Sequence, residues 1–224
     1  DIFGVEEIAI YSAPGRSEVG GNHTDHQHGT VLTASINLDS IGVVRATEDN
    51  TIRIVSDGYD EIVISLDDIM LRQEDNGTTM ALIKGVVSGF VNRQYEVGGS
   101  IAYITSDVLI GAGLSSSAAF ETLIGTILSG LYNNNSISPV EIAIIGQYAE
   151  NVYFGKPCGL MDQMACSVGN LVYIDFANPY SPEVEKIELD MGQYGYSLCI
   201  TDTKGSHADL TDELSKFLSG FKMT

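Results

Sequence analysis

Short apolar stretches with alternating polar positions dominate the first third of the chain. A period of two residues is typical of β-strands that bury one face. Turn-forming residues such as Asn50 and the group Ser56, Asp57 and Gly58 separate these stretches. The pattern therefore predicts a series of mostly antiparallel strands at residues 8–11, 31–36, 41–46, 51–55 and 61–66.

A helical period of three and four residues follows in the middle of the chain. Residues 79–95 carry apolar side chains at this spacing, and residues 119–131 form a second continuous apolar stripe. Between and after these helices, alternating apolar residues predict further strands at 101–108, 171–176 and 197–201. The remaining residues to the end are acidic, and we expect them to be helical.

A third helix has a clear start signal at Ser138. Ser is a preferred N-cap, Pro139 suits the first turn, and Glu141 stands three residues after the cap. We expect this helix to continue to about residue 154 and to end at Gly155. Because strands and helices are segregated along the chain and do not alternate regularly, the sequence predicts an α+β fold.

The charge of the chain narrows the classes of partner. Asp and Glu number 30 against 11 Lys and Arg, which gives a formal net charge of -19. This argues against a broad nucleic-acid surface. Three cysteines without metal-ligand spacing indicate reduced thiols, and neither a signal peptide nor an apolar run of about 18 residues is evident. We therefore expect a cytoplasmic protein without a membrane partner.

The segment at residues 111–119, Gly-Ala-Gly-Leu-Ser-Ser-Ser-Ala-Ala, lies between a predicted strand and a predicted helix. A helix start offers free backbone N–H groups to an anion, and glycines let the chain approach phosphate oxygens closely. The segment is not a Walker loop, because no Gly-Lys-Ser/Thr follows, nor a dinucleotide fingerprint, because Ser116 replaces the third glycine. Two interpretations stay open: a triphosphate site and a flexible turn capped by serine.

Residues 14–29 contain three of the four histidines, at 23, 26 and 28. A zinc site is one interpretation, but a helical pair of histidines four residues apart is missing. A solvated polar turn is another. A third is a sugar site, because short polar side chains that donate or accept suit a hydroxyl-rich ligand. Asn22, His23 and Asp25 fit that description.

Residues 150–164 place Asp162 among apolar neighbours after the turn Lys-Pro-Cys-Gly. A buried carboxylate is costly unless it is paired. Burial would raise the pKa of Asp162, whereas a neighbouring Arg would lower it. The alternative is that Asp162 only caps a helix.

Taken in this order, the three segments resemble the GHMP kinase superfamily and, within it, the galactokinases. The resemblance covers residues 8–210 and rests on Pro14-Gly15-Arg16 with Gly21-x-His23-Thr24-Asp25, on residues 111–119, and on Cys158-Gly159-Leu160-Met161-Asp162-Gln163. It implies a GHMP kinase N-terminal domain, a mixed and largely antiparallel sheet backed by helices, at residues 1–176. Residues 177–224 would begin a second, truncated α+β domain, because the family's third glycine-rich motif is missing.

The resemblance also implies an activity: transfer of a phosphoryl group from ATP, with Mg²⁺, to the anomeric hydroxyl of galactose. In this interpretation Asp162 accepts or orients the hydroxyl proton and Arg16 is its cationic neighbour. Ser117 and Glu150 would hold Mg²⁺. The sugar-binding residues would be Asn22, His23, Asp25 and Gly159, and the ATP-binding residues Gly111, Gly113, Leu114, Ser115, Ser116, Ser117 and Ala118. We expect a monomer whose partners are a galactose-like sugar and ATP.

Two positions depart from the galactokinase pattern. Asn22 stands where the family usually has Glu, and His26 where it usually has Tyr. Asn still hydrogen-bonds a hydroxyl but no longer repels an anion. The sugar could therefore differ, and a galacturonate or N-acetylgalactosamine kinase is an alternative. Two other classes also stay open: a non-catalytic galactokinase-like sugar sensor, and an interaction domain whose Gly/Ser loop, residues 111–119, is only structural.

Overall fold

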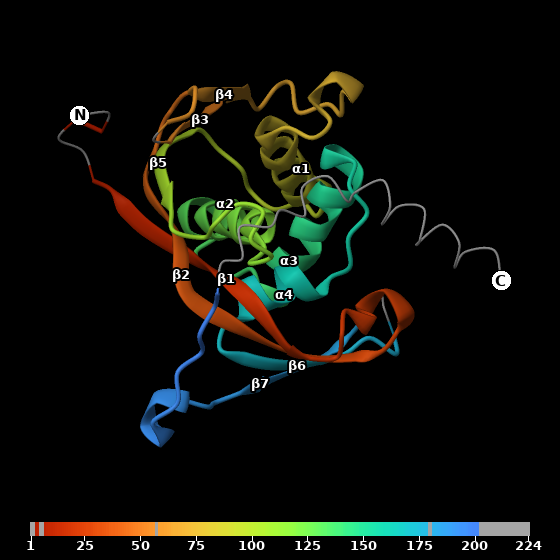
Figure 1. The fold of residues 1–224 in the computed structure, drawn as a ribbon. Helices are drawn as coiled ribbons and strands as arrows, with labels where there is room; N and C mark the ends of the chain where they lie inside the picture. Colours follow the sequence, from red (N-terminus) through yellow and green to blue (C-terminus); the bar gives the residue numbers. More distant parts are fainter. Residues whose placement is uncertain (1–2, 5–6, 57, 179–180, 202–224) are drawn as a thin grey trace.

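The computed structural model describes residues 3–4, 7–56, 58–178 and 181–201. In this part of the chain a curved sheet of seven strands forms one layer, and the four α-helices lie together on one side of it (Figure 1). The strand order is β4-β3-β5-β2-β6-β7, with β1 paired to β2. None of the helices in the described residues has the length and apolar character to cross a membrane. The predicted α+β class is confirmed.

The sheet is mixed but largely antiparallel, as predicted. Only the β3–β5 pair is parallel among the described pairs. The strands are β1 (Ala9–Gly20), β2 (Thr30–Ala46), β3 (Thr51–Ser56), β4 (Ile62–Ser65), β5 (Ser100–Ser106), β6 (Leu171–Asp175) and β7 (Glu183–Ile187).

Four strand predictions need correction. The strand expected at residues 8–11 continues to Gly20, so Arg16 lies in β1 and not in a polar turn. The strands expected at 31–36 and 41–46 are one strand, because polar residues between them still pair with β1, as Pro14 does with Asp39. Residues 197–201 are exposed and form no strand, and β7 was missed because polar side chains occupy most of this exposed edge strand. The acidic end expected to be helical lies outside the described residues.

The helices are α1 (Thr79–Asn92), α2 (Ser116–Tyr132), α3 (Pro139–Tyr148) and α4 (Met161–Val168), with short 3₁₀ turns η1 (Thr24–Gln27), η2 (Gln73–Asp75) and η4 (Met191–Tyr194). The predicted cap is confirmed, since the Ser138 hydroxyl accepts the Glu141 N–H at 3.2 Å. After α3 the chain winds as a π-helical segment, η3 (Ala149–Phe154), and ends at Gly155 with φ 81°. Helix α4 was missed, because no capping side chain precedes it.

Three clusters of buried side chains hold the layers together. The largest lies between the sheet and helices α1 and α2, and a second surrounds β6, α3 and α4. The third cluster includes buried residues of the Gly/Ser loop, residues 111–119. It consists of Ile36, Val108, Leu114, Ala118, Ala119 and Cys166. Strand β2 runs through all three, because it contributes Val44, Val31 and Ile36 to them in turn. Strand β2 therefore connects the packing around the loop with the two larger clusters.

Candidate active site

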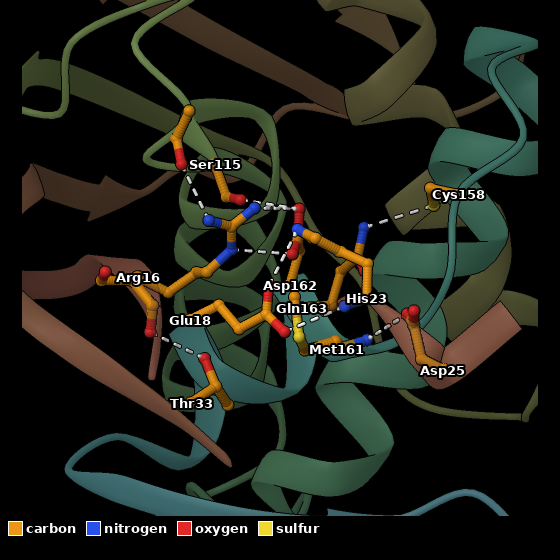
Figure 2. Close-up of polar contacts among 12 residues, drawn as sticks. Arg16, Glu18, His23, Asp25, Thr33, Ser115, Cys158, Met161, Asp162 and Gln163 are labelled. Atoms are coloured by element: carbon orange, nitrogen blue, oxygen red, sulfur yellow. Dashed lines mark hydrogen bonds and ion pairs between the residues drawn. The ribbon is translucent and has the colours of Figure 1, made fainter. Parts of the chain in front are cut away.

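The centre of the candidate site is an ion pair between Arg16 on β1 and Asp162 in the first turn of α4 (Figure 2). The guanidinium donates from Nε to Asp162 Oδ1 at 2.7 Å and from Nη2 to Oδ2 at 2.9 Å. A bidentate ion pair of this kind fixes the orientation of the carboxylate and also balances its charge. The Arg16 side chain is 9% exposed, whereas that of Asp162 is 31% exposed, so the carboxylate stays open to a ligand.

Local backbone geometry explains how a strand side chain reaches this position. The register of β1 on β2 shifts between Pro14 and Arg16, and such irregularities redirect side chains. Gly15 at this shift lies close to the Gly/Ser loop: an added Cβ would be 2.9 Å from the Leu114 carbonyl oxygen. The Arg16 N–H donates to that oxygen at 3.1 Å, and Arg16 Nη1 donates to the Gly113 carbonyl at 2.8 Å. These two hydrogen bonds join β1 to the Gly/Ser loop.

The loop itself adopts left-handed backbone at Gly111, Gly113 and Ser115, with φ of 73°, 75° and 59°. Left-handed backbone is natural for glycine and costly for serine. The Ser115 side chain makes no cap on α2 but donates to Asp162 Oδ2 at 2.7 Å. The first-turn N–H groups of the 17-residue helix α2 therefore have no side-chain cap, which favours the anion-site interpretation over a serine-capped turn.

The remaining residues of the predicted phosphate segment lie where α2 begins. Ser116, Ser117 and Ala118 form its first turn, and Ser116 and Ser117 are partly exposed. Leu114 and Ala118 are buried in the third cluster, so only their backbone groups are available to a ligand.

The ion pair sets the protonation of both partners. Burial alone would raise the pKa of Asp162, but the hydrogen bonds from Arg16 and Ser115 and the charge of Arg16 hold it below its ordinary value. Burial would likewise lower the pKa of Arg16, and Asp162 raises it instead. Asp162 is therefore an ionised carboxylate at neutral pH, as its pairing with an arginine leads one to expect. The alternative that Asp162 only caps a helix is wrong, because α4 has no side-chain cap and the Asp162 side chain is bound by Arg16 and Ser115.

Asp25 lies in η1, beside the turn that leads into α4 (Figure 2). Its Oδ2 accepts the Met161 N–H at 3.2 Å, and its Oδ1 is buried without a hydrogen-bond partner. Gly159 leaves the space for this carboxylate, since an added Cβ would lie 1.7 Å from Asp25 Oδ2. A buried carboxylate oxygen without a partner is costly, and a ligand hydroxyl would satisfy it.

Asn22 and His23 precede η1, and both are exposed with left-handed backbone, at φ 56° and 52°. Glu18 holds this bend, because its Oε1 accepts the His23 N–H at 2.9 Å and its Oε2 lies 3.5 Å from His23 Nε2. We had not singled out Glu18 from the sequence. Within the described ranges, His, Cys, Asp and Glu side chains form no metal-binding group of three or more, so the histidine-rich segment gives no support to a zinc site.

Ser117 and Glu150, predicted as the metal pair, come together between α2 and η3. Ser117 Oγ donates to Glu150 Oε1 at 3.1 Å, and the Glu150 side chain is 3% exposed. One hydroxyl and one carboxylate fit Mg²⁺, which takes few protein ligands and keeps waters and phosphates. Lys156 Nζ also lies 3.1 Å from Oε1, and the charge of Glu150 raises the pKa of Lys156 although burial would lower it.

Two further buried polar residues, Gln163 and Glu121, adjoin Glu150 and were not predicted from the sequence. Gln163 Nε2 donates to Glu150 Oε2 at 2.8 Å and to Glu121 Oε2 at 3.1 Å. Burial, followed by the charge of Glu150, raises the pKa of Glu121 well above its ordinary value. A sequence signal for Glu121 existed, because a carboxyl residue inside the apolar stripe of a buried helix is unusual.

Comparisons with known proteins relate the chain to a family of kinases. Residues 81–170 match the family of the GHMP kinases N terminal domain, and residues 1–46 match the galactokinase galactose-binding signature. The galactokinases of Clostridium tetani and Streptococcus suis are 29% and 32% identical over 209 and 216 residues. In both cases the alignment covers 93% of this chain, and it covers 53% and 54% of the relatives. The chain thus spans about half the length of the curated relatives it matches.

Solved structures show the same fold. The galactokinase of Lactococcus lactis, complexed with galactose, superposes with a TM-score of 0.75 at 29% identity, covering 84% of this chain and 50% of that one. The mevalonate kinase of Methanococcus jannaschii gives a TM-score of 0.69 at 16% identity, covering 98% and 74%. Residues 81–170 of the chain therefore carry a GHMP kinase N-terminal domain. The galactose-binding signature and the relatives make the chain similar to the galactokinases within that superfamily.

Proposed function

We propose that the protein transfers the γ-phosphoryl group of ATP to the anomeric hydroxyl of galactose, giving galactose 1-phosphate. The observation that carries this proposal is the carboxylate of Asp162, which is held by Arg16 and Ser115 between the Gly/Ser loop and the turn that Asp25 contacts at Met161. The galactokinase relatives support the same reaction.

Asp162 is the proposed proton acceptor or orienting group for the sugar hydroxyl. Its low pKa keeps it ionised, and its partial exposure leaves room for a hydroxyl at the carboxylate. Arg16 balances the charge of Asp162 and places a positive charge where negative charge develops during phosphoryl transfer. The two hydrogen bonds between them fix the orientation of the carboxylate before substrate arrives.

The sugar is proposed to lie against Asp25, His23 and Asn22, with Gly159 providing the space. Asp25 Oδ1 is the strongest argument, because this buried oxygen has no partner among the described residues. A sugar hydroxyl would donate to it. The relatives give no support to a galacturonate or N-acetylgalactosamine kinase or to a non-catalytic sensor, although Asn22 departs from the usual Glu.

ATP is proposed to bind with its phosphates at Gly111, Gly113, Leu114 and Ser115 and at the first turn of α2, residues 116–118. Backbone N–H groups there suit phosphate oxygens. Ser117 and Glu150 would hold Mg²⁺, which when bound neutralises phosphate charge. Local positive groups of this kind are needed, because the net charge of -19 otherwise repels the nucleotide.

The remaining expectations stay part of the proposal. We propose a cytoplasmic monomer with residues 1–176 as the first domain and residues 177–224 as the beginning of the second. Strand β7 pairs with β6, so the sheet extends beyond residue 176, and the division there remains a prediction.

The test is an assay of the intact protein with Mg-ATP and galactose, with galacturonate and N-acetylgalactosamine in parallel. Asp162→Asn should lower kcat on galactose about 10²–10⁴-fold, the usual contribution of a positioned acid or base, while galactose still binds. Asp67→Asn is the matched control, because Asp67 is exposed and its carboxylate accepts a hydrogen bond from Asn50, away from the candidate site. Absence of phosphoryl transfer to galactose would refute the proposal, and absence of transfer to all three sugars would refute the alternative sugar kinases as well.

A further inference from the structure

Lys156 contacts the same oxygen atom of Glu150 that Ser117 contacts. Lys156 Nζ and Ser117 Oγ each lie 3.1 Å from Glu150 Oε1, while Gln163 Nε2 binds the other oxygen, Oε2, at 2.8 Å. Ser117 and Gln163 are neutral. Of these three partners Lys156 is therefore the charged one, and a buried carboxylate needs a charged partner.

The local backbone is built to bring Lys156 back to Glu150. Residues six apart do not face each other on an α-helix, where neighbours are three and four apart. Here the π-helical segment ends at Gly155 with φ 81°, and the Lys156 N–H donates to the Glu150 carbonyl at 3.1 Å. The chain thus turns back on itself, and the lysine side chain folds over the carboxylate. π-Helical turns of this kind are frequent at functional sites.

The ammonium group is held but remains accessible. The Lys156 side chain is 37% exposed, whereas that of Glu150 is 3% exposed. A lysine head group is a compact charge on a flexible four-carbon stem. It can therefore leave Glu150 Oε1 and follow a nearby anion without a change in the backbone.

We propose that Lys156 is a tethered cation that occupies Glu150 Oε1, the oxygen that Ser117 also contacts, when no nucleotide is bound. This inference rests on the proposed function, in which Ser117 and Glu150 hold the divalent ion. A free divalent ion would meet the positive charge of Lys156, whereas an ion that arrives with a triphosphate brings the negative charge that draws the lysine away. Lys156 thus makes the site selective for the metal–nucleotide complex over the free ion.

The test measures binding of Mn²⁺ to the intact protein, followed by the electron paramagnetic resonance of free Mn²⁺, without nucleotide and then with AMP-PNP. Repulsion between charges of +1 and +2 at roughly 5 Å, with solvent-like screening, corresponds to about a tenfold change in affinity. Lys156→Met should therefore bind Mn²⁺ alone about tenfold more tightly. Its affinity for the Mn²⁺–AMP-PNP complex should not increase.

Lys186→Met is the matched control. It removes the same charge from β7, where Lys186 lies 3.6 Å from Glu188, and it should leave Mn²⁺ affinity unchanged. If Lys156→Met fails to fold, Lys156→Gln provides the same comparison, because it keeps a hydrogen-bond donor without the charge. Equal or weaker binding of free Mn²⁺ by the Lys156 variant, relative to the natural protein, overturns the inference.

A further substitution separates this inference from the metal assignment beneath it. In the Lys156→Met background, Glu150→Gln should abolish the gain in Mn²⁺ affinity. If Mn²⁺ binding does not depend on Glu150, the metal assignment fails and the inference fails with it. If binding depends on Glu150 but not on Lys156, only the inference is overturned.

Discussion

Gly159 offers a sharp test of the sugar pocket, because it is the residue that makes room for Asp25. In Gly159→Ala the new Cβ would lie 1.7 Å from Asp25 Oδ2 and 2.5 Å from Cγ. Contacts this short cannot persist, so the Asp25 carboxylate must move and its hydrogen bond from the Met161 N–H must break. The substitution therefore acts on Asp25 without changing its chemistry.

The expected loss follows from the hydrogen bonds that Asp25 would make to the sugar. One hydrogen bond to a charged group contributes about 1.5–3 kcal/mol, which corresponds to galactose affinity about 10–150-fold weaker. Isothermal titration calorimetry with galactose measures this directly. Overpacking also costs about 1–3 kcal/mol of stability, so a thermal unfolding curve of each variant must set the temperature at which binding is compared.

Two variants make the result decisive. Gly20→Ala is the matched control, because an added Cβ there meets no heavy atom within 4 Å. In an Asp25→Ala background, Gly159→Ala should cause little further loss, since the two substitutions act on one contact. Galactose binding by Gly159→Ala equal to that of Gly20→Ala would refute the sugar-binding role of Asp25 or the closeness of the two residues.

Two further predictions concern buried charge. Glu121 has a pKa raised well above 4.5, so the folded chain keeps a proton that the unfolded chain loses as pH rises past 4.5. The free energy of unfolding of the natural chain should therefore fall with rising pH relative to that of Glu121→Gln. Urea unfolding from pH 4 to 8 that shows a constant difference between the two would contradict this. Lys84 is 6% exposed and lies 2.6 Å from Asp75, so Lys84→Met should destabilise by about 3–5 kcal/mol because it strands a partly buried carboxylate. Urea unfolding of Lys84→Met and of Lys84→Met with Asp75→Asn tests this second prediction, since the double variant should recover part of the loss.

Periodicity predicted the regular part of the fold well. The helices predicted at residues 79–95 and 119–131 correspond to α1 (Thr79–Asn92) and α2 (Ser116–Tyr132), and the predicted cap at Ser138 is present. Apolar spacing and local capping are properties that the sequence carries directly. Strand continuity did not follow, because residues between 36 and 41 join β2 through pairing with β1, and pairing between distant segments has no local signal. Helix α4 was not predicted because no side-chain cap marks its start.

The candidate site was predicted from a resemblance to a kinase family and not from periodicity. Composition alone left the Gly/Ser loop, the histidine-rich segment and Asp162 each with several interpretations, and only their combined resemblance to a kinase family joined them. The structure brings Arg16 and Asp162 into contact across 146 residues of sequence, which no spacing rule would show. Glu18 and Gln163 were missed because they support other residues, and support depends on tertiary contacts. Whether the assigned residues bind sugar and ATP remains a prediction.

The long strand β2 has a consequence for how the chain folds. Its pairing with β1 is between neighbours in sequence, whereas β5 and then β6 join its other edge from much farther along the chain. Contacts between distant residues cost more chain entropy and tend to form later. Asp162 belongs to the segment just before β6, so we expect β1 to position Arg16 before Asp162 reaches it. On this expectation, the Arg16–Asp162 ion pair forms among the last contacts of the described sheet and reports that β6 has joined it.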